Sequence, residues 1–121
     1  MAAFLTDSSL DAALNYIKTN ATVLHICSSQ PANYAGVAAV SLGTKTSPTI
    51  GSPVDGTSGR KVVVSAITDG SVSATGTASH YAIVSGTELL AANTLSASQS
   101  VTNGNVFTLA AFDITLPDPT A

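Results

Sequence analysis

The second half of the chain alternates small apolar and polar side chains, and this constrains its fold more than any other feature. From Ser71 to Val84 every second residue is Val, Ala, Gly or His, and the residues between them are Ser, Thr, Tyr or Ile. Side chains on a strand point alternately to two faces, so the pattern predicts β-structure rather than helix. The dipeptides Asp69-Gly70, Ser85-Gly86 and Asn103-Gly104 are typical of tight turns between such strands.

These turns divide the chain into about seven strands of the kind found in β-sandwiches and barrels. The connections are too short for helical crossovers, so the sheet is expected to be largely antiparallel. Gly76 falls within the alternating run and predicts a bulge there. The fold class is therefore all-β, an antiparallel sandwich or barrel-like domain. The expected strands are Ala21–Ser28, Ala38–Leu42, Arg60–Thr68, Val72–Val84, Glu88–Ala92, Ser96–Thr102 and Asn105–Leu116.

One short helix is expected before the strands, over residues 6–20. Thr6, Asp7 or Ser8 can cap it, and its apolar residues recur at helical spacing. Asp7 near its start and Lys18 near its end suit the helix dipole. A helix this short is marginal alone, so its apolar stripe must dock on the sheet. That stripe consists of Leu10, Ala13, Leu14 and Ile17.

The length of 121 residues is typical of one domain. Three segments lack a periodic pattern: an N-terminal arm at residues 1–5, a long loop at residues 33–58, and a tail at residues 117–121. Long loops in compact domains are often functional. We therefore predict a single β-rich domain whose contacts with other molecules concentrate in these segments.

Composition excludes several classes of function. Charged residues are only 9% of the chain and the net charge is −3, which argues against binding to nucleic acid. The apolar stretches are too short for a membrane helix, and the N-terminus has no signal-peptide pattern, so we expect synthesis in a cytoplasm. The single cysteine, Cys27, allows no internal disulfide and is expected to be a buried free thiol without a metal.

Candidate catalytic groups are few, so the sequence favours a protein that is not an enzyme and has no cofactor. His25 and Cys27 share one strand face but are too far apart for direct hydrogen bonding. His80 alternates with small residues on a face predicted to point inward. A Gly/basic cluster at residues 56–61 resembles a phosphate-binding loop but leads into a strand rather than a helix. The two histidines and Cys27 are better interpreted as structural residues, and Arg60 and Lys61 of the basic cluster as candidates for ion pairs with a partner.

Three stretches together resemble a family of small structural proteins of tailed double-stranded-DNA bacteriophages: Leu10–Pro31, Gly59–Ile83 and Asn103–Pro117. The resemblance covers nearly the whole chain and is weakest over residues 33–58. Tyr81 stands where a Trp often follows the His in this family, which keeps a large ring. The family has no catalytic motif to transfer.

The resemblance implies a virion structural protein, most plausibly one that decorates and stabilises the capsid shell. Its expected partner is the major capsid protein, with a homotrimer or other homo-oligomer on the capsid surface. Two alternatives stay open: a host-surface or carbohydrate-binding module displayed on the virion, and a head–tail connector or tail component. The scarcity of aromatic residues, 5% with no Trp, weighs against carbohydrate binding.

Candidate partner contacts come from the segments without periodicity. Exposed apolar groups in a soluble protein tend to mark interaction surfaces, and two basic residues next to the long loop can form ion pairs with a partner. An alternative also stays open, in which the apolar residues fold back on the helix or cap the end of the sandwich. The candidates are Phe4, Leu5, Tyr34, Val37, Ile50, Val54, Arg60 and Lys61.

Overall fold

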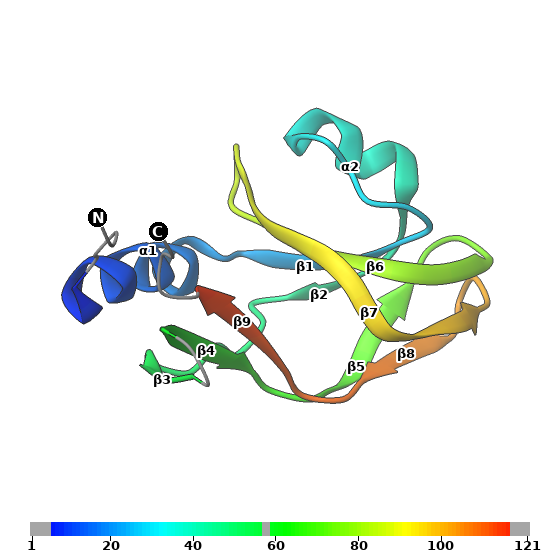
Figure 1. Cartoon of the computed structure of the whole chain (residues 1–121). Coiled ribbons are helices and arrows are strands. Elements are labelled where there is room, and N and C mark those ends of the chain that lie inside the picture. The colour runs from blue at the N-terminus through cyan, green and yellow to red at the C-terminus, as the bar shows by residue number, and fades with distance from the viewer. Residues whose placement is uncertain (1–5, 57–58, 117–121) are drawn as a thin grey trace.

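The computed structural model describes residues 6–56 and 59–116. These residues form a mostly β, barrel-like domain with two helices (Figure 1). The elements in chain order are α1 (Asp7–Asn20), β1 (Val23–Cys27), α2 (Tyr34–Val40), β2 (Ser41–Thr46), β3 (Val54–Asp55), β4 (Arg60–Val64), β5 (Ile67–Val72), β6 (Gly76–Val84), β7 (Leu89–Val101), β8 (Val106–Leu109) and β9 (Phe112–Leu116).

Six strands form one antiparallel sheet in the order β7-β6-β1-β2-β5-β8. The sheet curls, so that its two edge strands, β7 and β8, approach each other (Figure 1). The Asn103-Gly104 turn joins these two edge strands, and Gly104 has a φ of +90°, a conformation that favours glycine. The fold is therefore a barrel whose last pair of strands does not pair along its length.

A second sheet of three strands, β3-β4-β9, closes one end of the domain. Helix α1 lies at this end (Figure 1) and contacts β4. Thr6 caps it, since the Thr6 side chain accepts a hydrogen bond from the backbone N–H of Ser9 at 3.2 Å. The predicted helix is confirmed, and Leu10 and Leu14 of its predicted docking stripe are buried. Ile17 is half-buried, but Ala13 is exposed and does not dock.

The interior of the curled sheet is the main core. Leu24 and Ile26 of β1, Ile83 of β6 and Phe107 of β8 are at most 1% exposed there. Phe107 lies directly against Gly70 of β5, where a methyl group would collide with its ring. The core thus combines many aliphatic side chains with the ring of Phe107, which is placed over a glycine.

A smaller apolar cluster lies on the outer face of the sheet beneath α2. It contains Cys27, Val37, Ala82 and Val84, all at most 3% exposed. Strand β1 therefore has apolar residues on both faces, as its sequence predicted. The prediction that Cys27 is buried as a free thiol is confirmed.

The prediction of a long loop over residues 33–58 is wrong. Helix α2, strand β2 and the short strand β3 occupy most of this range, and α2 takes up much of the strand predicted over Ala38–Leu42. Strand β2 lies inside the six-stranded sheet, between β1 and β5. Its sequence, Ser41–Thr46, has weak β-patterning and contains Gly43. That glycine is required because a side chain there would collide with the backbone of Ser71. Tertiary packing, rather than local preference, places this strand.

Two predicted turns are confirmed and one is wrong. Ser85-Gly86 joins β6 to β7, and Asn103-Gly104 joins β7 to β8. Asp69-Gly70, however, lies within β5, because the glycine is required for contact with Phe107 and not for a turn. Gly76 begins β6 instead of bulging within it. The strands predicted over Glu88–Ala92 and Ser96–Thr102 are one strand, β7, and Asn105–Leu116 is two strands in different sheets.

Candidate functional site

Edge strand β7 separates from its neighbour β6 in the middle of its length. Ala78 pairs with Gln99, yet the next pair is His80 with Thr94, so one residue of β6 faces four residues of β7. These four, Leu95–Ser98, have no register partner. An irregularity of this kind bends a strand, and β7 curves strongly along its length (Figure 1).

The opposite side is formed by β8, β9 and the two alanines that join them. β8 pairs with β5 and β9 pairs with β4, so the chain changes sheets at Ala110 and Ala111. The side-chain Nε2 of Gln99 donates a hydrogen bond to the carbonyl oxygen of Thr108, at 2.9 Å, and connects the two sides. We call the gap between residues 93–99 and 108–113 the seam.

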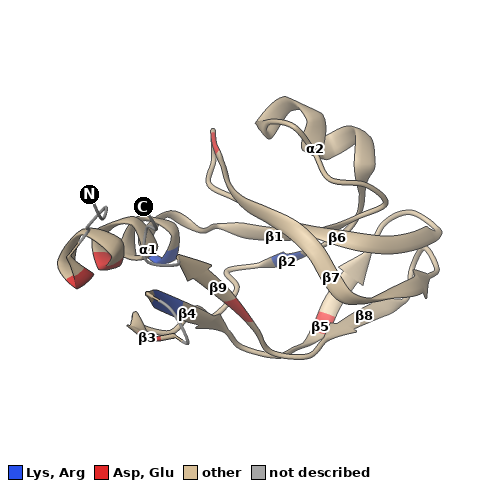
Figure 2. Ribbon diagram, viewed as in Figure 1, with Lys and Arg blue, Asp and Glu red and all other residues tan. Residues whose placement is uncertain are grey.

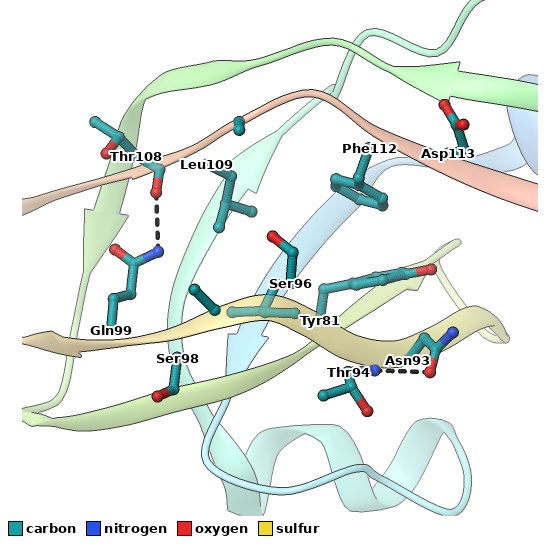
Figure 3. Close-up of a pocket in the computed structure, with 13 residues that line it drawn as sticks. Tyr81, Asn93, Thr94, Ser96, Ser98, Gln99, Thr108, Leu109, Phe112 and Asp113 are labelled. Atoms are coloured by element: carbon teal, nitrogen blue, oxygen red, sulfur yellow. Dashed lines mark hydrogen bonds between the residues drawn. The ribbon is translucent and has the colours of Figure 1, made fainter.

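A pocket of about 480 Å³ occupies the seam. Its inner wall contains Tyr81 and Phe112, whose ring centroids lie 4.5 Å apart with the rings tilted by 39°. Figure 3 shows Phe112, Leu109 and Ser96 pointing into the space between the two sides. The lining residues are Tyr81, Asn93, Thr94, Leu95, Ser96, Ala97, Ser98, Gln99, Thr108, Leu109, Ala110, Phe112 and Asp113.

Polar groups of the seam are mostly small and neutral. Asn93 Oδ1 accepts a hydrogen bond from the backbone N–H of Thr94 at 2.8 Å (Figure 3). Asp113 provides the only carboxylate among the lining residues, and Lys61 Nζ holds it at 3.1 Å. Burial raises the pKa of the Tyr81 hydroxyl, so that phenol stays protonated at neutral pH. The arrangement suits binding through shape and backbone contacts more than proton transfer.

Charged residues gather away from most of the seam. In Figure 2 they lie mainly on α1, β3, β4 and β9, while β7 and β8 are almost entirely uncharged. Arg60 contacts Asp11 at 2.8 Å and Asp55 at 2.6 Å, which ties α1 to the three-stranded sheet. Hydrogen bonds to these carboxylates raise the pKa of the Arg60 guanidinium further above its usual range.

The two histidines and the cysteine do not form a common site. His25 Nδ1 lies 2.8 Å from Ser41 Oγ, and burial lowers the pKa of His25. Burial raises the pKa of the Cys27 thiol to about 11, so it is unreactive at neutral pH. His80 lies on the half-buried outer side and not on an inward face as predicted, because the alternation of β6 changes phase between Ala78 and Tyr81. No group of three potential metal-binding residues occurs within the described ranges.

The predicted contact residues are not gathered into one surface. Tyr34 and Val54 are 42% and 46% exposed, on α2 and β3. Val37 and Ile50 are buried, Val37 on the face of α2 that packs against the sheet and Ile50 in the main core, so neither is available at the surface. For Ile50 the structure supports the alternative of packing against the sandwich.

Of the four other predicted contacts, the structure describes the two basic residues but not the two apolar ones. Arg60 and Lys61 are both engaged within the chain, Arg60 with Asp11 and Asp55 and Lys61 with Asp113. Their predicted role toward a partner must therefore compete with these ion pairs. Phe4 and Leu5 lie outside the described residues, as do the N-terminal arm and the tail.

Sequence reasoning missed the seam because no local pattern marks it. The one available signal was the interruption at residues 93–95 between two predicted strands, which coincides with the start of the irregular part of β7. The residues that face each other across the seam lie mostly on β7 and β8, the two opposite edge strands of the sheet, and they meet only when the sheet curls.

Comparisons of the chain with protein-family models, with curated proteins and with solved structures gave no match. Neither described helix has the length and apolar character needed to cross a membrane.

Proposed function

We propose that this chain is a non-enzymatic structural protein of a tailed-phage virion, which binds the major capsid protein and stabilises the shell from its outer surface. The resemblance of Leu10–Pro31, Gly59–Ile83 and Asn103–Pro117 to small phage structural proteins carries the proposal. Those stretches supply all of β1, β4, β5, β8 and β9 and most of α1 and β6, which together form most of the folded frame.

The surface of the domain is consistent with this role. A decoration protein adheres through many copies, so each contact can be weak while the attachment of the layer is firm. The seam presents uncharged strand edges, which suit pairing with another protein chain. Strands β7 and β8, which supply many of its lining residues, carry no charged residue, whereas the ion pair between Arg60 and Asp11 joins β4 to α1.

Carbohydrate binding is less well supported by the same pocket. Sugars commonly stack on an exposed aromatic face, but Tyr81 is only 6% exposed and packs against Phe112. A connector or tail position has no specific observation in its favour. The decoration role is therefore the function we carry forward.

The test compares virions with and without this chain. We expect particles that lack it to assemble with normal shape but to release DNA at a lower temperature than complete particles. Electron microscopy of the complete particle should find the chain distributed over the shell. Failure of assembly without the chain, unchanged thermal robustness, or confinement of the chain to one vertex would contradict the proposal.

A further inference from the structure

The seam exposes backbone that a folded protein normally pairs. β7 is the terminal strand of its sheet, so one of its edges has no neighbouring strand. Leu95–Ser98 also lack a register partner on the β6 side. Among residues 6–56 and 59–116, no turn or loop backbone hydrogen bond involves these four residues either. Unpaired N–H and C=O groups on a strand edge are a template for another extended chain.

The opposite side of the seam has the same character. β8 is the other terminal strand of the sheet, and Ala110 and Ala111 fall between two strands without a register partner. The carbonyl of Thr108 receives its hydrogen bond from the Gln99 side chain, in the place of a backbone donor. A side chain thus bridges the two edges where a closed barrel would have a strand pair.

We propose that an extended segment of the shell protein enters the seam as an added β-strand and pairs with the backbone of Leu95–Ser98. This inference rests on the proposed function, since that function supplies the partner. The seam runs along seven residues of β7, Asn93–Gln99. At roughly 3.3 Å per residue these seven residues span about 20 Å, which is the length of a strand of about six to seven residues.

The chemistry of the seam favours such a segment with small, uncharged side chains. Its lining is Ser, Thr, Ala, Leu, amide and aromatic side chains, and the single carboxylate, Asp113, is already paired with Lys61. A charged side chain placed here would lose hydration without gaining a partner. An uncharged strand instead gains backbone hydrogen bonds along the edge and apolar contact with Leu109 and Phe112.

A second copy of this chain is a poorer occupant. Within residues 6–56 and 59–116 every strand already belongs to one of the two sheets, so another copy could offer only the outer edge of one of its own sheets and not an extended segment that enters the seam. A soluble sugar would leave most of the strand-edge N–H and C=O groups unpaired. The shell protein is the partner to which we commit.

Hydrogen exchange tests the inference on the unmodified protein. Amide exchange is measured on the free chain and on the chain after it has been added to shells that were assembled without it. We expect the amides of residues 94–99 and 109–113 to exchange at least about tenfold more slowly when bound, since paired edge amides are protected. Binding to shells with no slowing in the seam would overturn this inference and leave the proposed function standing.

A matched pair of variants tests the same point by affinity. Ser96→Lys places a charge in the seam, where the Ser96 side chain points inward (Figure 3), whereas Ser100→Lys places it on the same strand outside the lining. Both serines are exposed, so both variants should fold. We expect Ser96→Lys to weaken binding to shells at least about tenfold and Ser100→Lys to change it less than about twofold. Equal effects of the two variants would overturn the inference.

Overlapping synthetic peptides that span the major capsid protein identify the segment. One uncharged peptide should bind the wild-type chain and Ser100→Lys but not Ser96→Lys. If the chain still binds shells, any of three results would overturn the inference. The first is that no peptide binds. The others are that self-association protects the seam amides of the free chain at high concentration, or that a soluble sugar competes with shells for the seam. Failure of the wild-type chain to bind shells at all would instead contradict the proposed function.

Discussion

The two sides of the six-stranded sheet are built in opposite ways. On the closed side, β2, β5 and β8 pack tightly around the ring of Phe107, which is 1% exposed. Gly43 and Gly70 provide the room for this ring because they have no side chain. On the open side, β7 and β8 are connected by one side-chain hydrogen bond and enclose a pocket of about 480 Å³. Both sides belong to the same sheet and share strand β8.

The difference shows which part of the domain contributes most to its stability and which part presents a surface that can bind another molecule. Contacts on the closed side are densely packed, so changes of even one methyl group should be felt there. The open side has exposed small residues and strand edges, so changes there should affect binding more than folding. Four predictions test this contrast, from the largest expected effect to the smallest.

Removal of the central ring should have the largest effect on stability. Phe107→Ala leaves a cavity beneath two glycines that cannot fill it, and we expect a loss of about 3–5 kcal/mol in the free energy of unfolding. Urea denaturation measures it. Val106→Ala on the same strand is the control, because Val106 is 68% exposed and should cost little. A loss below about 1 kcal/mol for Phe107→Ala would contradict the description of the closed side.

Adding a methyl group at the same contact should have the next largest effect. In Gly70→Ala the new Cβ would collide with the Phe107 ring, so we expect a loss of roughly 1–3 kcal/mol. Gly86→Ala is the control, since no atom lies within 4 Å of a Cβ there. Combining Gly70→Ala with Phe107→Leu should be less damaging than the sum of the two single changes. Strict additivity would show that the two residues do not share this contact.

The apolar cluster beneath α2, on the outer face of β1 and β6, makes the stability fall at alkaline pH. The folded state holds the Cys27 proton up to a pKa of about 11, and an unfolded thiol loses it near pH 8.5. The contribution is therefore full below about pH 8.5 and is lost as the pH rises toward 11. We expect the wild type to lose roughly 1–2 kcal/mol by pH 10 relative to its own value at pH 7 through this group.

Cys27→Ala isolates this pH effect, because both proteins keep the same tyrosines and lysines. Denaturation midpoints measured from pH 7 to pH 10 should fall more steeply for the wild type than for Cys27→Ala. Parallel curves for the two proteins would show that Cys27 is not buried in solution, and rapid alkylation of Cys27 at neutral pH would show the same.

On the open side, a charged substitution should leave folding almost unchanged. Ser96→Lys is expected to alter the free energy of unfolding by less than about 0.5 kcal/mol, as is its control Ser100→Lys, because both positions are exposed. Thermal and urea unfolding of the two variants check this. A large loss for Ser96→Lys alone would mean that the seam is packed shut in the free protein.

Several elements could be predicted from the sequence because their causes are local. The capped helix α1, the strand β1 with apolar residues on both faces, and the turns at Ser85-Gly86 and Asn103-Gly104 all follow from neighbouring residues. Turn chemistry and side-chain periodicity act over a few positions, so their signals survive without knowledge of the fold. The burial of Cys27 followed from the same kind of pattern.

Other elements could not be predicted because distant residues decide them. Asp69-Gly70 has the sequence of a turn, but Phe107 of another strand requires that glycine within β5. Strand β2 has little β-preference and is held by β1 and β5 on its two sides. The seam depends on residues from β6, β7, β8 and β9 that meet only when the sheet curls.

The sequence by itself therefore determined the β-rich class, the docked N-terminal helix and the scarcity of charge and catalytic groups, since these depend on composition and short-range pattern. Only the tertiary structure decided which glycines lie in strands, which apolar residues of the 33–58 range are buried, and that the sheet stays open at one seam. The physical reason is that strand pairing and close packing join residues far apart in the chain, and their geometry overrides the local preferences of each segment.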